Sequence, residues 1–222
     1  MTGRTGRRSS RDRKQKSALA HRIECLRLRQ AVEPGWLRYA RSAIDLEKRR
    51  GDGDVHTVYL LRHAKSDWSD QTLPDHARPL APRGRRDAKR IAKHLRRRGI
   101  APMLVLCSSA ERTRETLELV RPALGGAPVQ IEDGLYAAAN EELLERLRVL
   151  PEQSASVLVI GHNPGLQELA LVLATPGRTR RRLEAKFPTA ALATLAVSHA
   201  TWAQLAAGDA ELAAFVVPKQ LR

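Results

Sequence analysis

Short apolar runs alternate with longer amphipathic stretches through residues 55–222 of the chain. Apolar runs bounded by turn residues predict buried strands, and the amphipathic stretches predict helices long enough to connect parallel strands. This alternation is typical of an α/β domain with a largely parallel sheet. The predicted strands are 58–61, 103–107, 129–131, 157–160, 191–197 and 212–217, and the predicted helices are 83–98, 110–124, 141–150 and 164–174.

Residues 1–54 have a different pattern. Residues 1–17 are almost all polar or basic and contain no apolar residue after Met1, so they cannot bury enough surface to offset chain entropy. Helix formers dominate residues 17–50, but Pro34 and Gly35 interrupt their weak apolar stripe. We therefore expect a basic extension over residues 1–54, disordered or partly helical, and a folded domain over residues 55–222.

The charge of the chain changes this picture little. The net charge is +15, of which residues 1–54 contribute 15 basic against 7 acidic residues and the remainder 24 against 17. A nucleic-acid-binding module that uses the basic extension is therefore an alternative to an enzyme. Nothing supports it strongly, because the extension has only Trp36 and Tyr39 as aromatic residues and no zinc, RNP or helix-turn-helix signature.

The chain carries no pattern of a secretory signal and no apolar run of about 18 residues. We expect a cytoplasmic protein without a membrane partner, although the Arg-rich opening also resembles an organelle transit peptide. Only two cysteines occur, Cys25 and Cys107, so neither a disulfide framework nor a zinc-binding spacing is available.

Polar residues gather where the predicted strands end. Arg62 and His63 follow the first strand, Ser108 and Arg112 the second, and His162 the fourth. Ligands of open α/β sheets bind outside the carboxyl ends of the strands, so we expect these segments to meet at one crevice.

Two helices are also predicted to begin at this crevice. Ser108 and Glu111 have the spacing of a capping box, and Asn163 precedes Pro164 as a helix cap precedes a proline in the first turn. Free N–H groups at helix starts bind anions, and guanidinium groups match phosphate oxygens. The arginines expected to serve in this way are Arg62, Arg78 and Arg112.

The two histidines suit different tasks in a phosphate site. A neutral imidazole can attack phosphorus and hold the phosphoryl group, which splits one hard displacement into two easier ones. We assign this role to His63. His162 is expected to donate a hydrogen bond to the phosphoryl oxygens, where charge is spread during transfer. This chemistry requires no metal and no cofactor.

Leu61-Arg62-His63-Ala64 resembles the signature of the histidine phosphatase superfamily, which includes the phosphoglycerate mutases. Further segments resemble the SixA-type phosphohistidine phosphatases: Arg62-His-Ala-Lys-Ser-Asp-Trp68, Arg78-Pro-Leu80, Arg83-Gly-Arg85, Ser108-Ser-x-x-Arg112-Thr113, Gly161-His-Asn-Pro164, Lys186-Phe-Pro-Thr-Ala190 and Trp202. The resemblance covers about residues 56–220. It implies a three-layer α/β/α domain of the phosphoglycerate mutase type, with a mostly parallel central sheet.

The resemblance also implies roles for single residues. His63 is expected to become phosphorylated, with Arg62, Arg112 and His162 binding the phosphoryl group and Arg78 completing the pocket. The residues expected at the pocket rim are Lys65, Ser66, Ser109 and Asn163.

One feature of the wider superfamily is missing. Its mutases and many of its phosphomonoesterases carry an acid that protonates the leaving oxygen, whereas only Glu132 and Asp133 are nearby candidates in this sequence. Imidazole leaves from phosphohistidine more easily than an alkoxide leaves from an ester, so the absence favours phosphohistidine as substrate. A small-molecule phosphomonoesterase of the same superfamily is the alternative. The partner is accordingly a phosphorylated protein or a small phosphorylated metabolite, and the sequence indicates neither which one nor the oligomeric state.

Other candidate groups have simpler interpretations. Ser108 and Ser109 suit a helix cap better than a nucleophile, because no nucleophile elbow surrounds them. Cys107 lacks the spacing of a cysteine phosphatase loop and is expected to be a small core residue. The remaining histidines are expected on the surface or in linkers: His56, His76, His94 and His199.

Overall fold

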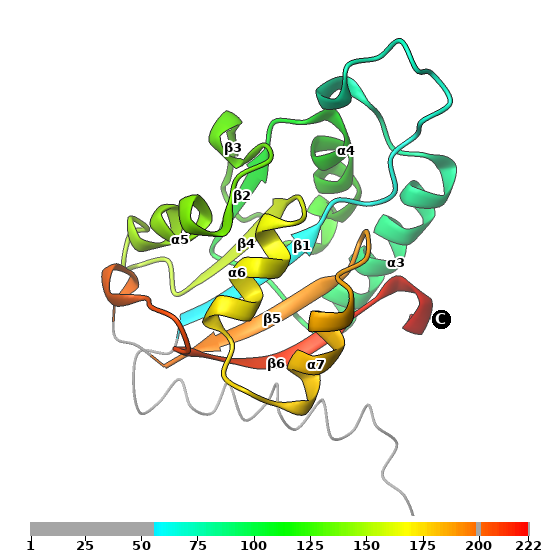
Figure 1. The fold of residues 1–222 in the computed structure, drawn as a ribbon. Helices are drawn as coiled ribbons and strands as arrows, with labels where there is room; N and C mark the ends of the chain where they lie inside the picture. Colours follow the sequence, from blue (N-terminus) through cyan, green and yellow to red (C-terminus); the bar gives the residue numbers. More distant parts are fainter. Residues whose placement is uncertain (1–55, 199–200, 222) are drawn as a thin grey trace, which may run out of the picture. The chain divides into compact units, whose positions relative to one another are not determined.

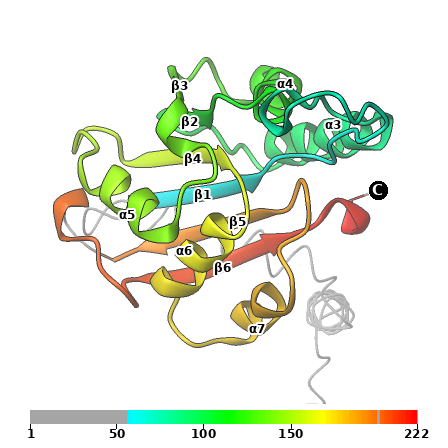
Figure 2. The same ribbon diagram turned by 45° about the horizontal axis from the view of Figure 1, so that its top comes forward.

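The computed structural model describes residues 56–198 and 201–221. The predictions for the extension over residues 1–54 and for His199 lie outside the described residues. The described part has a six-stranded sheet with helices on both of its faces (Figures 1 and 2). The predicted three-layer α/β/α architecture is therefore confirmed.

All six predicted strands form. They are β1 (His56–Arg62), β2 (Leu104–Ser108), β3 (Val129–Glu132), β4 (Ser156–Gly161), β5 (Leu192–Val197) and β6 (Ala210–Val216). Their order in the sheet is β3-β2-β4-β1-β5-β6. The strands β1 to β4 pair in parallel, whereas β5 is antiparallel to both β1 and β6. The sheet is thus mostly parallel, with an antiparallel edge.

The four predicted helices form, with two differences from the prediction. The four predicted helices are α3 (Pro82–Arg97), α4 (Glu111–Val120), α5 (Asn140–Arg148) and α6 (Gly165–Leu173). The expected helix over 110–124 gives way to a 3-10 turn after Val120, where Pro122 follows. A fifth helix, α7 (Arg178–Ala185), was not predicted, because Leu183 is its only buried residue and leaves no apolar period to detect.

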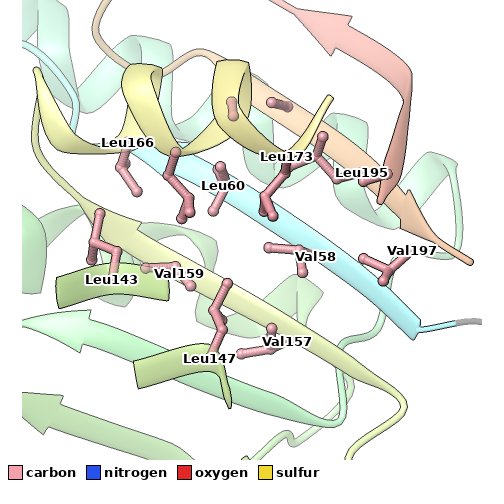
Figure 3. Packing of buried hydrophobic residues seen from close by; sticks show 14 of the residues in the cluster. Val58, Leu60, Leu143, Leu147, Val157, Val159, Leu166, Leu173, Leu195 and Val197 are labelled. Atoms are coloured by element: carbon pink, nitrogen blue, oxygen red, sulfur yellow. The ribbon is translucent and has the colours of Figure 1, made fainter. Parts of the chain in front are cut away.

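The core has two halves because strand residues alternate between the two faces of the sheet. Val58 and Leu60 of β1 belong to the half under α5 and α6, which Figure 3 shows with Leu143, Leu147, Leu166 and Leu173. Leu61 belongs to the half under α3 and α4. Coverage on both faces explains why these strands read as continuous apolar runs rather than as alternating ones.

A long connection, residues 63–81, joins β1 to α3 and is called here the β1–α3 loop (Figure 1). Its two arms meet at an isolated antiparallel bridge between Ser66 and Leu80. The backbone amide of Asp67 donates to the carbonyl oxygen of Pro79 at 2.8 Å, and the backbone amide of Ala81 donates to the carbonyl oxygen of Lys65 at 2.9 Å. The middle of the loop, which includes the 3-10 turn η2 (Asp75–Ala77), is thereby held as a closed excursion.

Candidate active site

The register of the sheet brings the two key histidines together. β1 and β4 pair in parallel, with Leu61 opposite Ile160 and Arg62 opposite Gly161. Just after β1 ends, the backbone amide of His63 donates to the carbonyl oxygen of Gly161 at 3.0 Å. His63 directly follows β1 and His162 directly follows β4, so the two rings lie side by side, with centroids 5.1 Å apart.

The imidazole of His63 is buried and oriented by its neighbour. Its Nδ1 lies 2.7 Å from the carbonyl oxygen of Ala64, which only accepts hydrogen bonds. Nδ1 therefore carries the proton and Nε2 keeps a free lone pair. The pKa of His63 is lowered to about 3, mainly by burial. The hydrogen bond to Ala64 acts in the opposite direction, whereas the charges of His162, Arg112 and Arg62 lower the pKa further. The ring is neutral near pH 7.

His162 is held in the opposite tautomer. Its Nδ1 lies 3.4 Å from Nη2 of Arg112, which only donates, so Nδ1 is the acceptor. Nε2 then donates to the hydroxyl of Ser108, 2.8 Å away. Burial and the charge of Arg112 lower the pKa of His162 to about 4.

The contact with His162 explains why the predicted cap at Ser108 was wrong. Helix α4 begins at Glu111 with Ala110 as its N-cap, and no side chain caps it. Ser108 is instead the last residue of β2, and its hydroxyl faces His162. The role of Ser108 is to orient a site histidine.

The predicted cap at Asn163 was wrong as well. Helix α6 begins at Gly165 with Pro164 as its N-cap, after a cis peptide bond between Asn163 and Pro164. The side-chain nitrogen Nδ2 of Asn163 donates to Oε1 of Gln167 at 2.9 Å and to the carbonyl oxygen of Phe187 at 3.3 Å. The side chain of Asn163 therefore does not cap the backbone amides of the helix. Both α4 and α6 nevertheless begin at the histidine edge of the sheet, as expected for this crevice (Figure 1).

Two arginines lie beside the histidines. Arg62 donates from Nη1 to the carbonyl of Phe187 at 2.8 Å, and burial, followed by the charge of Arg112, lowers its pKa. Arg112 is buried and bonds twice to Asp75, from Nη1 to the carbonyl oxygen at 2.6 Å and from Nη2 to Oδ2 at 2.8 Å.

These groups face a cavity of about 450 Å³ that is rich in positive charge. Its charged lining groups are Arg62, Lys65, Arg112 and a single carboxylate, Asp75. A cavity with this balance of charge suits an anionic ligand. The other residues that line it are His63, Ser66, Trp68, Tyr136, Ala137, His162, Asn163 and Thr189.

The cavity includes most of the predicted site residues and leaves out two. Ser109 does not line it, and its hydroxyl instead lies 2.9 Å from Nε2 of His76. Arg78 does not line it either. The guanidinium of Arg78 is buried behind Trp68, 4.1 Å from the centre of that ring, and donates to the carbonyl of Asp70 at 2.9 Å. In this structure Arg78 supports the β1–α3 loop.

Several lining residues were missed by the sequence analysis. Tyr136 stands edge-on to His162 with ring centroids 5.4 Å apart, and its hydroxyl donates to Oδ2 of Asp75 at 2.8 Å. Asp75 precedes Arg78 by three positions in a polar loop, where no pattern distinguishes it from other exposed acids. Thr189 and Trp68 belonged to segments that suggested a resemblance without indicating a role.

The acids considered from the sequence lie elsewhere. Glu132 accepts three hydrogen bonds from Arg146, at 2.8 to 3.2 Å, and does not line the cavity. Asp133 is exposed and also outside it. Neither is placed to reach a ligand in the cavity.

The structure also tests the predictions for Cys107, His56 and His94, none of which lines the cavity. Cys107 is buried in the core, and burial raises the pKa of its thiol to about 12, as expected of an unreactive core residue. His56 and His94 were expected on the surface or in linkers, and this was wrong, because both are buried.

Within the described ranges, no three His, Cys, Asp or Glu side chains are grouped as a metal ion would require. The same ranges contain no helix with the length and apolar character of a membrane span.

Comparison with known proteins agrees with this geometry. Residues 58–139 match the family model of the histidine phosphatase superfamily, branch 1. An uncharacterised protein of Mycobacterium tuberculosis is 39% identical over 165 residues, which cover 72% of this chain and all of that protein.

Solved structures give the same result. A protein of Nakamurella multipartita, assigned as a phosphohistidine phosphatase SixA, is 33% identical with a TM-score of 0.63, over 74% of this chain and 96% of its own. A SixA protein histidine phosphatase in complex with tungstate is 25% identical with a TM-score of 0.62, over 75% of this chain and 99% of its own. Since these likenesses extend across nearly the whole described domain, the chain belongs to branch 1 of the histidine phosphatase superfamily and is SixA-like within it.

Proposed function

We propose that this protein hydrolyses phosphohistidine, or a related phosphorylated substrate, through a covalent intermediate on His63. One observation carries the proposal: the hydrogen bond from Nδ1 to Ala64 leaves an unprotonated Nε2 in a cavity lined by Arg62 and Arg112. A neutral imidazole beside guanidinium groups is the combination that nucleophilic attack on a phosphoryl group needs.

In the first step, Nε2 of His63 forms a bond to phosphorus while the bond to the leaving group breaks. The imidazole gains positive charge, which the hydrogen bond from Nδ1 to the carbonyl of Ala64 stabilises. Arg62 and Arg112 supply donors for the three phosphoryl oxygens, where charge is spread in the transition state. In the second step, water attacks phosphorus and His63 leaves as a neutral imidazole.

His162 takes part only after a change of protonation. In this structure its Nδ1 accepts from Arg112, so that nitrogen has no proton to donate to a ligand. A bound phosphoryl dianion favours the protonated ring, because an opposite charge nearby raises the pKa of a histidine. The protonated Nδ1 then donates to a phosphoryl oxygen, while Nε2 remains bonded to Ser108.

The relatives support an oxyanion ligand in this cavity. The SixA phosphatase in complex with tungstate binds an anion that is tetrahedral, as phosphate is. We expect tungstate to inhibit this protein competitively. We also expect the natural substrate to be a phosphorylated protein or a small phosphorylated metabolite.

The proposal is tested by the fate of the phosphoryl group. Purified protein is expected to release phosphate from phosphohistidine and, after rapid acid-free denaturation, to carry an acid-labile, alkali-stable phosphoryl group, as a P–N bond requires. His63→Ala is expected to remove both signals, with a loss of at least about 10³-fold in kcat/KM. Activity that persists in a folded His63→Ala protein would refute the proposal.

A small-molecule phosphomonoesterase is the second candidate, and one observation favours it. Asp75 places a carboxylate in the cavity, where the sequence analysis had found no acid. The two candidates differ in preferred substrate. If sugar phosphates or nucleotides react with kcat/KM values far above that of phosphohistidine, the second candidate is the correct one.

A further inference from the structure

Asp75 is the only carboxylate among the residues that line the described cavity. It lies in the 3-10 turn η2 of the β1–α3 loop, far in sequence from Glu132 and Asp133. Its side chain is 46% exposed, so solvent and a leaving group both have access to it. A carboxylate in this position is available for proton transfer.

The contacts of Asp75 use one carboxylate oxygen and leave the other open. Oδ2 accepts from Nη2 of Arg112 and from the hydroxyl of Tyr136, both at 2.8 Å. Within the described residues no hydrogen bond is found for Oδ1. Arg112 also lies 3.4 Å from His162, so Asp75 is one side chain away from the groups that would hold the phosphoryl group.

We propose that Asp75 is the proton-transfer residue of this site, acting on the leaving group in the first step and on water in the second. This inference rests on the function proposed above. It extends that function to phosphate esters, whose leaving groups need a proton. Asp75 would be a catalytic residue, because its open oxygen would touch the reacting atoms.

The two steps balance with Asp75 included. In the first, Nε2 of His63 bonds to phosphorus, the P–O bond breaks, and the departing oxygen takes the proton of the Asp75 carboxyl group. In the second, a water oxygen bonds to phosphorus, the electrons of the P–N bond return to Nε2, and the water proton passes to Asp75. The carboxyl group is protonated again, so no other acid or base is consumed.

On this proposal, Asp75 obtains its first proton from the substrate. Partial burial acts to raise the pKa of Asp75, but the hydrogen bonds from Tyr136 and Arg112 outweigh it and hold the pKa below its usual value. A phosphate ester has its second pKa near 6, so it arrives partly as a monoanion. Its negative charge at Arg112 favours transfer of that proton to the carboxylate.

A positioning role is the competing explanation, because Asp75 holds Arg112 by two hydrogen bonds. The substitution Asp75→Asn distinguishes the positioning role from proton transfer. The backbone carbonyl and the amide oxygen of asparagine still accept from Arg112, whereas the side chain no longer transfers a proton. Proton transfer matters only when the leaving group is basic, whereas loss of Arg112 positioning affects every substrate equally.

The experiment measures kcat/KM of the full chain on a series of leaving groups: p-nitrophenyl phosphate, phenyl phosphate, glycerol phosphate and phosphohistidine. In Asp75→Asn we expect a loss of about 10²- to 10⁴-fold with the alkyl ester, the usual range for general acid catalysis. We expect less than about tenfold with p-nitrophenyl phosphate, whose leaving group needs no proton, and with phosphohistidine, whose ring can carry its own. Asp70→Asn is the matched control, since Asp70 lies in the same loop but its carboxylate bonds to Thr72 and does not line the cavity.

A second variant gives an independent readout. Tyr136→Phe removes one of the donors that stabilise the ionised carboxylate, so the pKa of Asp75 should rise. The alkaline limb of the kcat profile, measured with saturating glycerol phosphate, should then move to higher pH, which a purely structural contact would not cause. An unmoved limb counts against the inference.

The outcomes separate the two proposals. If the wild type hydrolyses none of the four substrates, or if His63→Ala remains active, the proposed function fails and the role of Asp75 fails with it. If the wild type and His63→Ala behave as expected but Asp75→Asn loses the same factor on every substrate, or nothing, only the role of Asp75 is overturned.

Discussion

At the scale of single residues, the reactivity of this site depends on burial. His63 and His162 both have pKa values lowered chiefly by burial, and each is fixed in one tautomer by a single neighbour, Ala64 for His63 and Arg112 for His162. Two neighbouring histidines thus present different ring nitrogens to the cavity, as their different proposed tasks require. His63, the proposed nucleophile, is neutral because charging it would leave a desolvated cation beside arginines.

The same burial predicts how stability depends on pH. His63, His94 and His162 have folded pKa values of about 3, 4 and 4, below the ordinary 6.5 of an unfolded chain. Between about pH 6.5 and pH 4 the unfolded state therefore binds protons that the folded state does not. Their contribution to the free energy of unfolding is full above pH 6.5 and declines as the pH falls through this window.

Urea unfolding at pH 7.5 and pH 4.5 measures this effect. We expect a clearly lower midpoint at pH 4.5, and a smaller difference when His94 is replaced by glutamine, which cannot take up the proton. Equal midpoints at the two pH values for the wild type would contradict the expectation.

At the scale of elements, packing around the β1–α3 loop decides where the site residues lie. Gly84 in the first turn of α3 faces the backbone of Lys65, and a Cβ atom at this position would overlap the Lys65 carbonyl oxygen. The helix therefore approaches the loop closely enough to fix the chain just after His63. Arg78 supports the other arm of the loop by stacking on Trp68.

Gly84→Ala tests this packing. Replacing glycine inside a helix by alanine ordinarily stabilises it by up to about 1 kcal/mol, because alanine has the higher helix propensity. Here the overlap with backbone should reverse the sign and cost about 1–3 kcal/mol, as overpacking does. Gly177→Ala is the control, since a Cβ atom there meets nothing within 4 Å. Thermal unfolding of both variants gives the answer, and a stabilised Gly84→Ala protein would contradict it.

The limits of the sequence analysis also become clear at this scale. The strands were predictable as apolar runs bounded by turn residues, and the four helices from their amphipathic period; the meeting of His63 with His162 followed from parallel strands ending at one edge. The positions of Asp75 and Tyr136 were not predictable. They depend on a loop path set by the Ser66–Leu80 bridge and on contacts with Arg112, for which the sequence has no periodic signal.

At the scale of the whole molecule, positive charge exceeds negative charge in the folded domain as well as in the extension. Residues 55–222 carry an excess of seven positive charges, and α3 alone exposes Arg86, Lys89 and Lys93 along its outer face. Field lines from such a surface raise the local concentration of anions and speed their capture. A phosphorylated ligand is the kind of molecule that benefits.

Salt is therefore expected to slow capture of the substrate but not its conversion. Raising the ionic strength from about 0.01 M to about 0.15 M shortens the screening length from about 30 Å to about 8 Å. We expect kcat/KM to fall several-fold while kcat, measured on bound substrate, stays nearly constant. The double variant Arg86→Glu, Lys89→Glu should lower kcat/KM at low salt and flatten its salt dependence. A wild-type kcat/KM that does not respond to salt would rule out steering.

The Ser66–Leu80 bridge has a consequence for protein engineering. Because the bridge closes the excursion at its base, residues 67–79 form a cassette that leaves and re-enters the domain at nearly one point. We expect the sheet to tolerate cassettes of other lengths there, provided that they keep Asp75, which holds Arg112, and Arg78, which stacks on Trp68. Libraries built on this segment should yield enzymes that differ in the esters they accept while sharing one phosphoryl-transfer step.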